Sequence, residues 1–67
     1  MSELYRAIGD RVRAERIRQN WTQDHLWQAA GLDRRSVQNV ERGRAMTLAT
    51  LARIARALDV PLADLVR

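Results

Sequence analysis

Residues 22–43, TQDHLWQAAGLDRRSVQNVERG, contain the pattern that decides the fold. Thr22 is a good cap for a helix that follows it, because its hydroxyl can accept a hydrogen bond from a free N–H of the first turn. Gly31 ends that helix, and Asp33 is a second cap residue that begins another. Apolar residues occupy the positions at which two crossed helices would touch: Leu26, Ala30, Leu32, Val37 and Val40. The stretch therefore predicts two short helices joined by a tight turn, although an ordinary helix pair in a bundle has similar spacing.

Amphipathic patterns on both sides of this stretch predict three further helices. Leu4, Ile8 and Val12 recur every four residues and would share one face of a first helix. Thr47 can cap a helix whose leucines and alanines recur at helical spacing, and Pro61 is favourable at the start of a last short turn. We expect a compact all-α fold forming one domain over residues 1–67, with helices over residues 3–19, 23–30, 34–42, 48–58 and 62–66.

The charge balance favours nucleic acid as a partner without establishing it. The chain has 12 basic residues, all of them arginine, against 8 acidic residues, for a formal net charge of +4. Guanidinium groups offer paired donors in one plane, which suits phosphate groups and guanine edges. The same arginine bias also accompanies a GC-rich genome, so both explanations stay open.

The composition argues against several other classes of protein. Without cysteine the chain has neither disulfides nor thiolate metal sites, which is not typical of a small secreted protein. No stretch resembles a signal peptide or a membrane span, so we expect a cytoplasmic protein with no membrane partner. His25 is the only histidine, and together with scattered carboxylates it makes no nucleophile, acid–base pair or metal site. We therefore expect neither an enzyme nor a bound metal or cofactor.

Residues 22–43 resemble the helix-turn-helix segment of the Cro/phage-repressor (XRE) family of transcriptional regulators. The family's pattern is Thr or Ser followed by Gln, then a leucine, a glycine, a cap, an apolar pair and Glu-x-Gly. The matching residues are Thr22, Gln23, Leu26, Gly31, Val37, Val40, Glu41 and Gly43. The similarity continues through VRAERIRQ and TLATLARIARALDVPLADL, so it covers nearly the whole chain. It implies a repressor-like five-helix fold whose third helix enters the major groove of duplex DNA.

Trp27 departs from the pattern of this family, which usually has a small alanine after the leucine of the second helix. A small residue at that position lets the two helices approach closely. Trp27 therefore implies either a more open crossing of the two helices or a ring that lies over the edge of the core.

The third predicted helix has an inner and an outer side on a helical wheel. Val37, Val40 and Glu41 share the inner side, and the outer side is polar. Arginine can pair with guanine O6 and N7, and asparagine or glutamine with adenine N6 and N7. The residues expected to contact bases are Arg34, Arg35, Gln38 and Asn39. The alternative for the two arginines is a solvated surface that pairs only with phosphates.

A second set of residues is expected to hold the DNA backbone. Gln23, at the start of the second helix, resembles the family glutamine that donates to a phosphate, and Thr22 caps the helix beside it. Arg42 and Arg44 flank the glycine after the third helix, where basic side chains would meet the backbone. The alternative for these two arginines is an ordinary charged loop.

Glu41 faces inward on the wheel, and a buried carboxylate without a partner is costly, so it needs a cation. Arg16 is the candidate, because in the family that this chain resembles an arginine of the first helix meets this glutamate. Such a pair would tie the first helix to the third. If both groups were partly exposed, the pair would contribute little to stability.

We expect the protein to act as a homodimer on a pseudo-palindromic operator in double-stranded DNA. Leu62, Leu65 and Val66 lie on a final turn that looks too short to bury them within one subunit, so they are expected to form the dimer interface. The main alternative is an antitoxin-type module that binds a small partner protein as well as DNA. A single-stranded RNA binder is less well supported, because the surface lacks repeated aromatic residues for base stacking.

Overall fold

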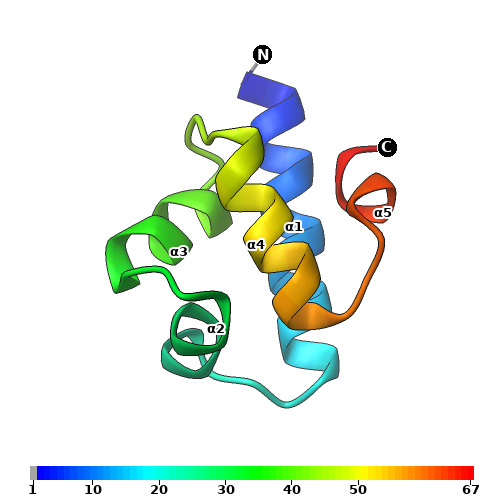
Figure 1. Ribbon diagram of the computed structural model, residues 1–67. Coiled ribbons are helices and arrows are strands. Elements are labelled where there is room, and N and C mark those ends of the chain that lie inside the picture. Colours follow the sequence, from blue (N-terminus) through cyan, green and yellow to red (C-terminus); the bar gives the residue numbers. More distant parts are fainter. Residues whose placement is uncertain (1) are drawn as a thin grey trace.

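The computed structural model describes residues 2–67, which form five helices and no strand (Figure 1). The helices are α1 (Ser2–Arg18), α2 (Gln23–Ala30), α3 (Arg34–Glu41), α4 (Leu48–Leu58) and α5 (Leu62–Val66). Their ends lie within one residue of the ranges expected from the sequence. The predicted fold class, an all-α helix-turn-helix fold of the repressor type, is confirmed.

Local hydrogen bonds fix the starts of the three middle helices. The side-chain oxygens of Thr22, Asp33 and Thr47 accept hydrogen bonds from backbone N–H groups three residues further on, over 3.0, 2.9 and 3.1 Å. Hydrogen bonds from the side chain and the backbone of Ser36 lower the pKa of Asp33. Each cap satisfies a backbone donor that the helix itself cannot pair.

The turn after α2 is built on a left-handed residue. Gly31 has φ 68° and ψ 32°, a conformation that glycine adopts without the strain of a side chain. The N–H of Leu32 then donates to the carbonyl of Trp27 over 2.9 Å and closes the turn. Leu32 and Asp33 are the two residues between Gly31 and the start of α3. The order of a glycine, an apolar residue and a cap in the sequence thus directs α3 across α2.

The core draws on all five helices. α1 packs against α3 and α5, and α2 packs against α3 and α4. The buried apolar residues are Ile8, Val12, Leu26, Ala30, Val37, Val40, Leu51, Ile54, Ala55, Leu58 and Leu65. Trp21 and Trp27 pack against this core from its edge and are partly buried. Trp27 therefore lies over the edge of the core, which is one of the two arrangements expected for it.

Gly9 allows α1 to approach the end of α3. A Cβ atom on Gly9 would lie 2.3 Å from the backbone oxygen of Val40 and 3.2 Å from that of Glu41. No side chain fits at the first of these distances, so the two backbones touch directly. The sequence pattern gave no sign of this role, because Gly9 lies in the middle of an otherwise regular helix.

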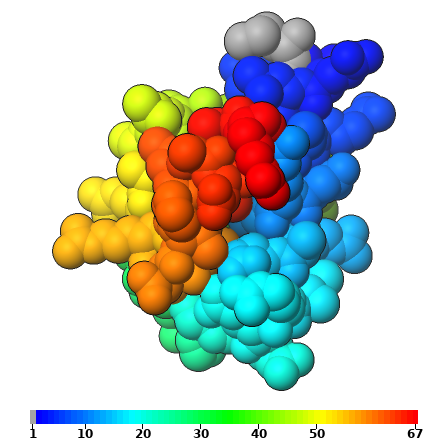
Figure 2. All heavy atoms as spheres, turned by 90° about the vertical axis from the view of Figure 1, so that its right-hand side faces the viewer, coloured from blue at the N-terminus to red at the C-terminus, as the bar shows by residue number. Residues whose placement is uncertain are grey.

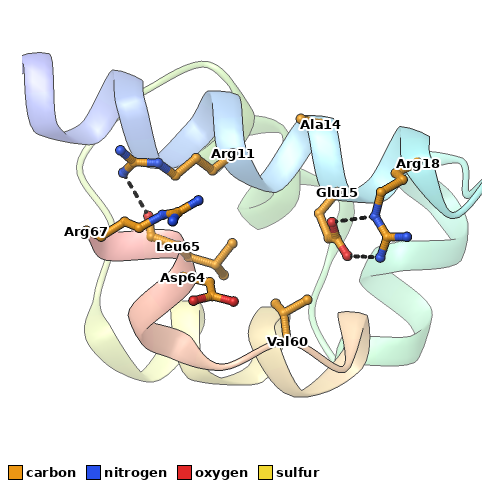
Figure 3. A pocket seen from close by; sticks show the side chains of 8 residues that line it. All are labelled: Arg11, Ala14, Glu15, Arg18, Val60, Asp64, Leu65 and Arg67. Atoms are coloured by element: carbon orange, nitrogen blue, oxygen red, sulfur yellow. Dashed lines mark hydrogen bonds and ion pairs between the residues drawn. The ribbon is translucent and has the colours of Figure 1, made fainter.

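α5 closes the opposite side of the molecule, between α4 and α1 (Figure 2). Leu65 is 2% exposed, and its carbonyl accepts a hydrogen bond from Arg11 Nη1 over 3.4 Å (Figure 3). The expectation that the last turn is too short to bury Leu65 within one subunit is therefore wrong, because α1 and α4 together cover it. Leu62 is partly buried, and Val66 remains 37% exposed.

None of the helices within residues 2–67 is long and apolar enough to cross a membrane.

Candidate nucleic-acid interface

α3 presents a polar surface on the side that faces away from the core. Its inner side is filled by Val37 and Val40, which are 0% and 1% exposed. The residues expected to contact bases all remain accessible to solvent: Arg34 and Arg35 are exposed, and Gln38 and Asn39 are partly exposed. A duplex approaching this side would therefore meet two guanidinium groups at the start of α3 and two amides in its second turn.

An ion pair with α1 fixes α3 on the side opposite its polar surface. Arg16 Nε donates to Glu41 Oε2 over 2.7 Å, and Arg16 Nη2 donates to Glu41 Oε1 over 3.1 Å. The two side chains are 12% and 4% exposed. Arg16 Nη1 donates to the carbonyl of Trp21 over 2.7 Å, so the same guanidinium also fixes the segment between α1 and α2. The pair is bidentate, which restrains the orientation of α3 as well as its distance from α1.

Gln23, the residue expected to donate to a phosphate, belongs to the same network. Its Nε2 donates to Glu41 Oε1 over 3.2 Å. One hydrogen of the amide is thereby directed at Glu41, and the amide carries a second hydrogen that can be donated elsewhere. Sequence reasoning missed this contact, because its spacing of 18 residues follows no local pattern. Thr22 is exposed beside it and uses its hydroxyl oxygen as the cap of α2.

The two arginines expected at the DNA backbone lie just beyond α3. Arg42 and Arg44 are both exposed. Arg44 Nη1 donates to Asn39 Oδ1 over 3.4 Å, and the backbone N–H of Arg44 donates to the carbonyl of Asn39 over 3.0 Å. The loop after α3 therefore folds back along the helix, and Arg44 lies next to one of the residues expected to read bases.

Asp24 connects α2 to the start of α3. Its Oδ1 lies 3.4 Å from Nε of Arg34 and accepts a hydrogen bond from Nε1 of Trp27 over 3.0 Å. Asp24 lies in the first turn of α2, where an acidic residue suits the positive end of the helix dipole. The contact with Arg34 depends on how the turn after α2 places the two helices, so the sequence pattern alone does not predict it.

His25 has an aromatic neighbour, Trp21. Its ring lies 4.2 Å from that of Trp21, with an angle of 31° between the planes. Within residues 2–67 no three His, Cys, Asp or Glu residues gather as metal ligands would. His25 is exposed and lies in the first turn of α2.

A model of a helix-turn-helix family matches residues 12–65, which include α2, the turn and α3. The chain belongs to the Cro/phage-repressor (XRE) type of helix-turn-helix family. The resemblance seen in residues 22–43 is thus confirmed, and the matched segment also includes Arg16 and Glu41.

Two solved structures are similar to this helix-turn-helix chain over most of their lengths. One is the restriction-modification controller protein C.AhdI from Aeromonas hydrophila, with 35% identity and a TM-score of 0.86, covering 91% of this chain and 94% of that one. The other is a hypothetical transcription factor, NHTF, from Neisseria, with 30% identity and a TM-score of 0.90, covering 100% of this chain and 79% of that one. No curated protein sequence matches the chain.

Proposed function

We propose that this protein is a transcriptional regulator that binds a specific sequence in double-stranded DNA by placing α3 in the major groove. The observation that carries the proposal is the position of Arg34 and Arg35. They are exposed at the start of α3, the second helix of the helix-turn-helix. The ion pair between Arg16 of α1 and Glu41 of α3 fixes the position of this helix on the core. The names of the two similar structures, a controller protein and a transcription factor, agree with this function.

The contacts divide into those that read bases and those that hold the backbone. Arg34 and Arg35 would donate to guanine edges, since the first residues of a recognition helix reach deepest into the groove. Gln38 and Asn39 would contact neighbouring base edges. Gln23, Thr22, Arg42 and Arg44 would lie against the phosphates on either side of the groove, where they fix the register of α3 without selecting a sequence.

We propose further that the protein binds as a two-fold homodimer, which places two copies of α3 about 34 Å apart, one turn of DNA. With Leu65 inside its own subunit, the exposed apolar surface of α5 consists of Ala63, Val66 and part of Leu62. Val66→Arg should convert dimers to monomers in sedimentation experiments. Ile17→Arg changes a side chain that is 52% exposed on α1 and is the matched control. A Val66→Arg protein that stays dimeric would exclude α5 from the interface.

Selection of bound sites from a pool of random duplex DNA tests the proposed function directly. We expect a short consensus sequence arranged as an inverted repeat, because a two-fold dimer presents the same surface to each half-site. Enrichment of a single half-site would support sequence-specific binding by α3 and would contradict the proposed homodimer. Enrichment of no sequence, with binding that depends only on salt, would refute the proposed function.

A further inference from the structure

Asp24 is an acidic residue where a DNA-binding surface would favour basic ones. It is the second residue of α2, its side chain is 55% exposed, and it lies beside Arg34. A carboxylate at this place repels phosphate groups and weakens binding to every duplex alike. The pair with Arg34, whose side chain is 61% exposed, also adds little to stability, since solvent screens such pairs. The helix dipole favours a carboxylate in the first turn of α2, but that stabilisation does not require the contact with Arg34.

The carboxylate of Asp24 approaches Arg34 at Nε, and this geometry indicates a different role for it. A contact at Nε restrains the stem of the arginine while the two terminal nitrogens, Nη1 and Nη2, remain able to donate. Those two nitrogens can form the paired hydrogen bonds to O6 and N7 of one guanine. An unrestrained arginine would lose more side-chain entropy on binding a base, whereas one that is already oriented loses less.

Trp27 in turn restrains Asp24. Its indole N–H donates to Oδ1, the same oxygen that faces Arg34, and its ring packs against the core. An indole nitrogen can only donate, so it orients an acceptor without competing for the arginine. The contacts thus form a chain from the core through Trp27 and Asp24 to Arg34. Trp27 is the residue at which this sequence departs from the small alanine of its family pattern.

We propose that Asp24, held by Trp27, positions Arg34 for one guanine and thereby sets the preference of the protein for one base pair in each half-site. This inference rests on the proposed function and adds two positioning residues to it. Asp24 lowers the affinity for all DNA and raises the selectivity at one position. It improves the ratio of specific to non-specific binding, which decides occupancy among many competing sites.

The experiment measures affinity for the selected duplex, for a scrambled duplex and for variants with each base pair changed singly. Arg34→Ala should lower the preference at one base pair about tenfold or more. Asp24→Asn should lower it at the same base pair by about threefold or more and leave the other positions unchanged. Its affinity for the scrambled duplex should stay equal or rise, because a negative charge is removed. Trp27→Phe keeps a ring and loses the donor, and should cause a smaller loss at that same position.

Two controls separate positioning from a structural or purely electrostatic effect. Asp10→Asn removes one negative charge from an exposed position on α1 and should leave the preference at every base pair unchanged. When Arg34→Ala is already present, Asp24→Asn should cause no further change in the pattern of preferences, whereas a structural defect would still add its own loss. Thermal melting of each variant shows whether it is folded.

Three results would overturn the inference. The first is an Asp24→Asn protein with full preference at the base pair that Arg34 reads, and the second is an equal loss at all positions. The third is an Arg34→Ala protein with unchanged preferences, which would transfer base reading to Arg35 and leave the proposed function intact. Only the failure of the wild-type protein to select any duplex would remove the proposed function itself.

Discussion

Replacing Glu41 with alanine removes the carboxylate on which three helices converge. The wild-type side chain is 4% exposed and accepts hydrogen bonds from Arg16 and Gln23. In the variant the guanidinium of Arg16, which is 12% exposed in the wild type, keeps one strong acceptor, the carbonyl of Trp21, and loses its counter-charge. Breaking a buried pair by removing one partner costs about 3 to 5 kcal/mol. The residual exposure of Arg16 places the expected loss near the lower limit, at about 3 kcal/mol.

The assay is reversible thermal unfolding, followed by the helical circular dichroism signal. For a domain of this size a loss of about 3 kcal/mol lowers the melting temperature by roughly 12 to 24 °C. The matched control is Glu15→Ala, which removes a carboxylate whose partner, Arg18, is 68% exposed, and should change the melting temperature far less. A Glu41→Ala protein that melts as the wild type does would refute the assignment of a structural role to this pair.

The remaining predictions concern packing, pH and DNA binding. Gly9→Ala should be destabilising, because overpacking of about 1 to 3 kcal/mol exceeds the gain of about 0.5 to 1 kcal/mol in helix propensity, as measured by urea unfolding. Because folding lowers the pKa of Asp33, its ionised carboxylate stabilises the fold at pH values above the ordinary pKa of 3.8. This contribution should disappear as the pH falls through the lowered pKa. Asp33→Asn, which caps without titrating, should show a smaller loss of unfolding free energy in acid. Arg44→Ala should weaken all duplexes equally and reduce the slope of log affinity against log salt by about 0.9, whereas Arg35→Ala should relax the preference at one base pair by about 1 to 3 kcal/mol.

The sequence predicted those features that depend on neighbouring residues. Thr22, Asp33 and Thr47 cap helices through contacts within one turn, so their chemistry is visible in a short window of sequence. Asn20, which follows α1, has φ 61°, a left-handed conformation that asparagine adopts more readily than most residues. The inward direction of Glu41 also came from helical periodicity, since the wheel needs only the register of one helix.

Features that depend on the packing of distant segments could not be predicted in this way. Leu65 looked exposed because its own turn is short, and part of its cover comes from α1, which is far away in the sequence. Gly9 gave no signal, because the carbonyl that it accommodates belongs to α3. Asp24 and Arg34 meet only because the turn at Gly31 sets the angle between two helices. In each case the missing information is a relation between two elements, and a linear pattern does not carry it.

The junction at Glu41 also has a consequence for the thermodynamics of binding. One side chain joins α1 through Arg16 and α2 through Gln23 to the last turn of α3, while the backbones of α1 and α3 are in contact at Gly9. The surface offered to a ligand is thus rigid before any encounter, and docking on it freezes few backbone torsions. We expect the heat-capacity change of complex formation to match the apolar area that the complex buries, without the additional contribution that accompanies folding coupled to binding.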